Sequence, residues 1–172
     1  INQTINEFHE VDDNKKFNVK FFTQAHQEHY LTAFKMFQDN ILFGQGPKMY
    51  RILCDQPPFD NIDTQCMTAN NTSHPHNTYI QLISETGLVG FLCIFVIFCC
   101  LLFYLIKHFF YMYFLRKNYI SDYRISLLLA LMVSLWPIIP TGNFFNNWLS
   151  VIYYLPVGFI LADMYKNKFF NK

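Results

Sequence analysis

Charged side chains are scarce in this chain: Lys, Arg, Asp and Glu make up 15% of its 172 residues. Hydrophobic residues make up 52% and aromatic residues 19%, which is too apolar for an ordinary soluble domain. Internal repeats, low-complexity segments and a signal peptide at the first residues are also lacking. The chain begins with Ile rather than Met, so we expect a fragment or a processed chain.

The few charges are distributed unevenly. Up to Asn77 there are six Lys or Arg and nine Asp or Glu, a net charge of −3, whereas from Leu88 onward there are seven and two, a net charge of +5. No charged residue occurs in 88–106, a stretch long enough for one transmembrane helix. None occurs in 125–162 either, which is too long for one span.

Proline, glycine and asparagine interrupt this second apolar stretch between residues 137 and 147. We therefore divide it into spans at about 125–140 and 145–162, and predict three transmembrane helices in all. Lys and Arg concentrate in 107–124 and at the C-terminus, which the positive-inside rule places in the cytoplasm. Residues 1–87 and the turn at 141–147 then face outward, which in a Gram-negative bacterium is the periplasm.

The chain thus divides into a periplasmic region (1–87) with amphipathic helices and a transmembrane region (88–172). We expect residues 1–25 to form a linker and residues 26–40 a helix. One face of that helix is apolar and carries Tyr30, Ala33, Phe34 and Phe37. Gln27, Glu28, Lys35 and Gln38 lie elsewhere on it. The simplest interpretation makes His26 and His29 solvated helix residues rather than ligands.

A turn follows the helix, because Gly44, Gly46 and Pro47 cannot continue it. A Gly-x-Gly turn alone is a weak sign of phosphate binding, since no strand precedes it. Arg51 is the only arginine in the first half of the chain. Its planar guanidinium suits pyrophosphate, although a surface arginine without a ligand remains an alternative.

Cys54 and Cys66 flank a loop rich in Pro and Asp. On the oxidising side of the membrane these two cysteines are expected to form a disulfide, which would contribute about 3 kcal/mol. An alternative zinc site would use both cysteines with His74 and His76. Its spacing fits no common zinc module, so we expect no metal.

The stretch 73–90 joins the polar and apolar halves. Ser73 can cap a helix and Pro75 suits a first turn, so we expect a helix to open here. His76 and Asn77 would then lie beside unpaired backbone donors that attract anions. The alternative is a capped amphipathic helix whose histidines are incidental.

The string His-Pro-His-Asn-Thr-Tyr-Ile-Gln-Leu-Ile-Ser-Glu-Thr-Gly-Leu-Val-Gly at 74–90 resembles the signature of the O-antigen ligase and polymerase family of bacterial membrane glycosyltransferases. The matching positions are His76, Asn77, Gln81, Leu82, Glu85, Gly87 and Gly90. Ile80 stands where that family usually has Leu. The segment 34–51 is similar to the helix and Gly-x-Gly turn that commonly precede the signature.

This resemblance implies an all-α integral membrane fold of the GT-C-like type, of which this chain would be the C-terminal part. It implies transfer of a glycan from an undecaprenyl-pyrophosphate carrier to a sugar hydroxyl, on lipid A-core or another glycan, at the periplasmic face of the inner membrane. No cofactor, metal or nucleic acid is expected.

The resemblance assigns His76 as the catalytic histidine and Arg51 as the pyrophosphate-binding arginine. A second arginine often lies in the family's preceding helix, where this chain has His26. Asn77 and Gln81 are expected to bind sugar hydroxyls, and His74 is expected to point away from the site. Two alternatives stay open: a non-catalytic transporter or flippase component, and an oligosaccharyltransferase with a protein acceptor.

Overall fold

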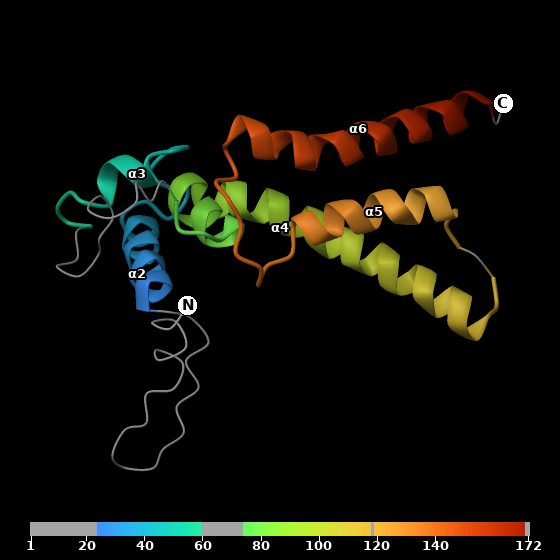
Figure 1. Cartoon of the computed structure of the whole chain (residues 1–172), viewed down its shortest axis with the longest axis horizontal. Helices are drawn as coiled ribbons and strands as arrows, with labels where there is room; N and C mark the ends of the chain where they lie inside the picture. The colour runs from blue at the N-terminus through green and yellow to red at the C-terminus, as the bar shows by residue number, and fades with distance from the viewer. Residues whose placement is uncertain (1–23, 60–73, 118, 171–172) are drawn as a thin grey trace, which may run out of the picture.

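The computed structural model describes residues 24–59, 74–117 and 119–170, and these contain five helices and no strand (Figure 1). The helices are α2 (Gln24–Asp39), α3 (Tyr50–Leu53), α4 (Thr78–Phe114), α5 (Asp122–Ser134) and α6 (Asn147–Phe170). The predicted all-α class is confirmed for this part of the chain. Almost all of the predicted linker lies outside it.

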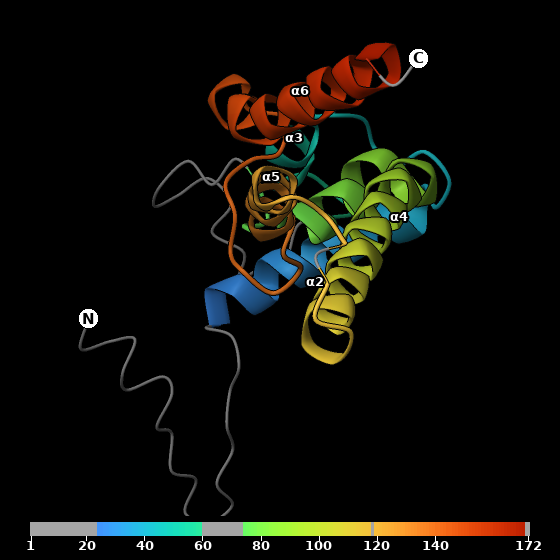
Figure 2. The same cartoon turned by 90° about the vertical axis from the view of Figure 1, so that its right-hand side faces the viewer.

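Two helices are long and apolar enough to cross a membrane, Thr78–Phe114 and Asn147–Lys166. Figures 1 and 2 show α5 running back between them, and α5 packs against both. Large apolar side chains cover their outer surfaces; Trp148, for example, is 86% exposed. Helices that are apolar on their outer faces are typical of a lipid environment, as expected of a membrane protein.

The third predicted helical span, 125–140, is not confirmed. Helix α5 has 13 residues and ends at Ser134, which gives it a length of about 20 Å against a hydrocarbon core of about 30 Å. Pro137 follows closely and cannot continue a helix. The chain instead returns to the start of α4 as a non-helical segment (Figure 1).

Side chains at the start of α4 provide hydrogen-bond partners for this non-helical segment. The Tyr79 hydroxyl donates to the carbonyl of Leu135 at 2.7 Å, and Asn77 Nδ2 donates to that of Pro137 at 2.7 Å. The Thr141 amide donates to the His76 carbonyl at 2.9 Å. Unpaired backbone groups are costly in an apolar environment, so these bonds allow the chain to leave the helical conformation there.

Helix α2 forms where it was predicted and packs against α4. Its predicted apolar face is confirmed only in part: Ala33 is fully buried, but Phe34 is 52% exposed, and Thr32 and Met36 are fully buried instead. Small or flexible side chains let α2 approach α4 closely, which a row of rings would prevent. The Phe34 ring is left on the outer surface.

The central contact of the fold is a break in α4 that the turn after α2 fills. Gly87 has φ 62° and ψ −162° inside the long helix. Across this break, the amides of Gln45 and Gly46 donate to the carbonyls of Ser84 and Glu85 at 3.0 and 2.8 Å. In the opposite direction, the amides of Leu88 and Val89 donate to the carbonyls of Ile41 and Leu42 at 2.9 and 3.2 Å.

This backbone contact leaves no room for a side chain at two glycines. A Cβ on Gly44 would lie 2.5 Å from the carbonyl carbon of Glu85, and one on Gly87 would lie 2.4 Å from the carbonyl oxygen of Leu42. Both residues also have positive φ, 66° and 62°. Glycine is therefore required on both sides of the contact.

We expect Gly44→Ala and Gly87→Ala each to destabilise the purified full-length protein in detergent. The left-handed conformation alone costs a side chain about 1–2 kcal/mol, and the overlap with rigid backbone adds to this. Thermal unfolding followed by size-exclusion chromatography measures the loss. Gly158→Ala is the control, because a Cβ there meets nothing within 4 Å; equal melting temperatures for all three variants would contradict the close contact.

Candidate functional site: a histidine cluster at the start of α4

Helix α4 begins later than the sequence suggested. Its N-cap is Asn77, whose Oδ1 accepts hydrogen bonds from the amides of Tyr79 and Ile80 at 2.9 and 3.1 Å. The predicted cap, Ser73, lies outside the described residues, and Pro75 precedes the helix. Because the Asn77 side chain occupies these two amides, they are not the unpaired donors for an anion that the sequence suggested.

Four histidines meet just before this helix end. The ring centroid of His76 lies 4.5 Å from that of His74, 5.6 Å from that of His26 and 5.8 Å from that of His29. His26 and His29 come from α2, while His74 and His76 come from the segment that leads into α4. His76 has φ 54°, an uncommon conformation outside glycine that often marks functional sites.

Two predictions about these histidines are wrong. His74 was expected to point away from His76, but the two rings are in contact. His29 was expected to be solvated, but it is 7% exposed and its Nδ1 lies 3.1 Å from the Tyr50 hydroxyl. The sequence did carry a signal for the cluster: the spacing of three puts His26 and His29 on one side of α2.

His76 differs from its neighbours in its hydrogen bonding. His29 pairs with the Tyr50 hydroxyl, and His74 Nε2 lies 3.1 Å from the carbonyl oxygen of Thr141. The ring of His76 contacts three other rings, but within the described residues its nitrogens have no hydrogen-bond partner. Its side chain is only partly buried, so these nitrogens are available to a ligand.

The environment favours the uncharged forms of His74 and His76. Burial lowers the pKa of His76 to about 4, and the neighbouring His74, His29 and His26 add to this effect. Burial also lowers the pKa of His74, although the Thr141 carbonyl partly opposes the shift. At neutral pH His76 is therefore an uncharged hydrogen-bond acceptor. In the described ranges, no three or more His, Cys, Asp or Glu residues are placed to hold a metal ion.

Asn77 and Gln81, the two predicted sugar-binding residues, make their hydrogen bonds within the protein. Gln81 is fully buried; its Nε2 donates to Glu85 Oε2 and Asn143 Oδ1 at 2.9 Å each, and its Oε1 accepts from the Phe144 amide at 2.9 Å. Asn77 caps α4 and donates to Pro137. A sugar would have to displace these bonds to reach either side chain.

Glu85 extends this network to α3. Its side chain is fully buried, and Oε1 accepts a hydrogen bond from the Tyr50 amide at 3.0 Å. Tyr50 in turn contacts His29, so the buried carboxyl group fixes the element that supports the cluster. Glu85 was recognised only as a matching position of the signature, and its place in the interior was not predicted.

Arg51 lies on α3 directly after Tyr50, with its side chain exposed and near enough to Glu85 to interact electrostatically. Among the described residues no contact joins Arg51 to His76. Cys54 is buried, with 1% exposure, beside Ala33 and Met36 of α2. Cys66 lies outside the described residues, so both the Cys54–Cys66 disulfide and the alternative zinc site stay untested.

Comparison with known proteins now identifies this region. Residues 23–95 match the family model described as O-Antigen ligase. This segment of the chain is similar to the O-antigen ligase family. It includes α2, the Gly-x-Gly turn, α3 and the first half of α4, which together hold all four histidines, and it confirms the predicted resemblance. No curated protein and no solved structure matches the chain.

The lowered pKa of His76 in this O-antigen ligase segment predicts a stability that depends on pH. In the folded protein His76 stays unprotonated down to about pH 4, whereas in the unfolded chain the same histidine takes up its proton near pH 6.5. The unfolded state therefore binds more protons between these values, so stability is fully present above pH 6.5 and is lost on acidification. We expect the melting temperature to fall from pH 7 to pH 4.5, and to fall less in His76→Gln. A melting temperature that does not change with pH in the original protein would contradict the lowered pKa of His76.

Proposed function

We propose that this protein transfers a glycan from an undecaprenyl-pyrophosphate carrier to a sugar hydroxyl, as an O-antigen ligase or polymerase. One observation carries the proposal: His76 is a neutral histidine with no hydrogen-bond partner among the described residues. It lies just before the N-terminus of α4, within the segment that matches the O-antigen ligase family model. Similarity to the O-antigen ligase family supports glycosyl transfer in general. The position of His76 suggests which side chain meets the acceptor.

His76 would orient the acceptor hydroxyl by accepting its hydrogen bond. A group with a pKa of about 4 is a weak base at neutral pH, so complete proton removal before bond formation is disfavoured. Glycosyl transfer passes through a transition state with oxocarbenium character, in which the donor sugar is strongly electrophilic. The acceptor then needs orientation more than prior deprotonation, and its proton passes to His76 as the new bond forms.

Arg51 would neutralise the leaving pyrophosphate. Charge develops on the pyrophosphate oxygens as the glycosidic bond breaks, and a guanidinium binds such oxygens through two parallel hydrogen bonds. The exposure of Arg51 beside the cluster-supporting Tyr50 leaves its side chain able to reach a ligand at the surface. His26 would add a further polar contact from α2, since its ring lies beside that of His76.

The position of the site in the membrane is also part of the proposal. The longest apolar helix, α4, begins beside the histidine cluster, and the cationic segment 107–124 lies at its far end (Figure 1). With that segment in the cytoplasm, residues 1–87 and the segment around Thr141 face the periplasm of a bacterial inner membrane protein. A GT-C-like fold, lipid A-core or another glycan as acceptor, and independence from metals and cofactors follow from the resemblance.

We expect His76→Ala and Arg51→Ala to abolish detectable glycan transfer in the full-length protein. Losing one transition-state contact costs about 3–4 kcal/mol, or about 10²–10³ in rate. Arg51→Lys should recover part of the activity, because a point charge cannot reproduce bidentate phosphate binding. Complementation of a deletion strain, read on a lipopolysaccharide gel with a parallel immunoblot, makes the measurement.

The exposed Gln56, which follows α3, provides the matched control, and Gln56→Ala should behave like the original protein. Normal glycan ladders from His76→Ala at unchanged membrane level would reject the catalytic assignment. In the deletion strain itself, loss of all long chains on lipid A indicates a ligase, and a single capped repeat unit indicates a polymerase. An unchanged ladder would favour a transporter component or a protein acceptor.

The proposed orientation can be tested by labelling. Cysteines introduced at the exposed residues Gln38 and Lys117, in a variant without other exposed cysteines, should lie on opposite sides of the membrane. A membrane-impermeant thiol reagent added to intact spheroplasts should modify the first and reach the second only after lysis. Labelling at Lys117 alone before lysis would reverse the orientation.

A further inference from the structure

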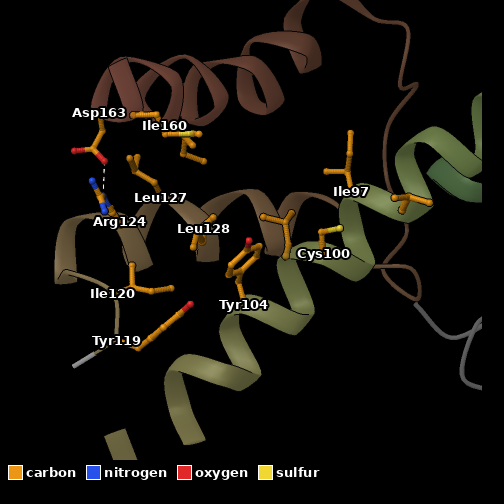
Figure 3. A pocket seen from close by; sticks show the side chains of 13 residues that line it. Ile97, Cys100, Tyr104, Tyr119, Ile120, Arg124, Leu127, Leu128, Ile160 and Asp163 are labelled. Carbon is orange, nitrogen blue, oxygen red and sulfur yellow. Dashed lines mark hydrogen bonds and ion pairs between the residues drawn. The ribbon is translucent and has the colours of Figure 1, made fainter. Parts of the chain in front are cut away.

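A groove of about 870 Å³ lies between α4, α5 and α6, away from the histidine cluster (Figure 3). It is lined by Ile97, Cys100 and Tyr104 of α4, by Leu128 of α5 and by Ile160 of α6, among others. From Gly87 to Tyr104 the chain advances about 25 Å along α4. The groove therefore belongs to the far half of the membrane region.

The groove is apolar along most of its length and polar at one end. Figure 3 shows Ile97 and Cys100 on one side, and Arg124, Asp163 and Tyr119 on the other. Arg124 and Asp163 form an ion pair through the Arg124 Nε. Among the described residues the guanidinium makes no further bond, so its two terminal nitrogens are left for an anion, and the side chain is 43% exposed.

Further positive charge lies beside this end. Lys107 Nζ stands 4.5 Å from the ring centroid of Tyr119, which lines the groove. Arg116 and Lys117 are exposed in the same loop. Cations at the end of an apolar groove are complementary to a ligand with an anionic head and a hydrocarbon tail. A neutral lipid offers the guanidinium no phosphate, and in a zwitterionic lipid the head-group cation beside the phosphate is repelled by the surrounding positive charge.

We propose that this groove binds an anionic phospholipid, with the phosphate on Arg124 and an acyl chain along α4. The volume falls within the range of about 300–1,000 Å³ that is usual for small-molecule sites. A polyprenyl carrier would fit less well, because its pyrophosphate belongs at the histidine end of α4 and its tail presents no anion to Arg124. The argument against the polyprenyl carrier rests on the proposed function, whereas the charge complementarity of the groove does not.

The pairing of Arg124 with Asp163 gives the test opposite expectations for the two residues. Arg124→Gln removes the phosphate contact, so binding of an anionic lipid should fall several-fold. Asp163→Asn removes the competing carboxylate and leaves the guanidinium fully available, so binding should be kept or strengthened. If the ion pair served only to hold α5 against α6, both substitutions would have the same effect.

The measurement is native mass spectrometry of the full-length protein in mild detergent. Dioleoyl-phosphatidylglycerol and dioleoyl-phosphatidylcholine serve as probes, because they have the same acyl chains and differ in head-group charge. We expect several-fold more phosphatidylglycerol adducts, reduced to the phosphatidylcholine level by Arg124→Gln. Lys48→Gln, which removes a cation near the histidine end of α4 that does not line the groove, should leave the adducts unchanged.

A second variant tests the groove without touching a charge. Cys100→Trp fills the apolar part, so it should lower the adducts of both lipids, and it keeps the proposal falsifiable if Arg124→Gln fails to fold. Equal adducts of the two lipids, or equal losses in Arg124→Gln and Asp163→Asn, would overturn the proposal. So would undecaprenyl phosphate that displaces phosphatidylglycerol, since it would assign the groove to the carrier. None of these readouts requires glycan transfer, so their failure is distinct from failure of the proposed function.

Discussion

The approach of two backbones at Gly44 and Gly87 is the constraint on which the functional end of this protein depends. Four hydrogen bonds cross between the turn at 41–46 and the break in α4, and they are possible only because neither glycine carries a side chain. This contact fixes where α2 ends relative to α4. Since α2 supplies His26 and His29 and α4 follows His76, the same contact sets the distances within the histidine cluster.

The buried polar side chains of α4 then secure the elements around that contact. Glu85 holds α3 through the Tyr50 amide, and Gln81 holds the segment that follows α5 through Asn143 and Phe144. A half-satisfied network in this apolar interior would be costly, and in the described part of the chain no buried side-chain polar atom lacks a partner. Several signature residues are thus used for architecture, which leaves fewer of them for the substrate.

The sequence predicted local features well and their assembly less well. Apolar length and helical spacing were sufficient for α2, α4 and α6, and the match between Gly87 and the signature was recognised. The break that Gly87 makes was missed, because its reason is a distant partner, the turn at 41–46. The exposure of Phe34 on α2 was missed because close helix packing outweighs hydrophobic periodicity there. The end of α5 was placed too late for a local reason, since Pro137 cannot continue a helix. The start of α4 was predicted too early, because Ser73 and Pro75 suit the beginning of a helix as well as Asn77 does.

Four histidines gather in this partly buried site, and burial lowers the pKa of two of them, His74 and His76. The Tyr50 hydroxyl and the Thr141 carbonyl each engage one ring, at His29 and His74, and hydrogen bonds of this kind fix a tautomer. Burial lowers the pKa of His76 to about 4, and His74, His29 and His26 add to this effect. All three rings contact that of His76, two of them from α2 and one from the segment that leads into α4. The chain therefore positions a single uncharged histidine among other rings, which suits the proposed role of accepting a hydrogen bond from an acceptor hydroxyl.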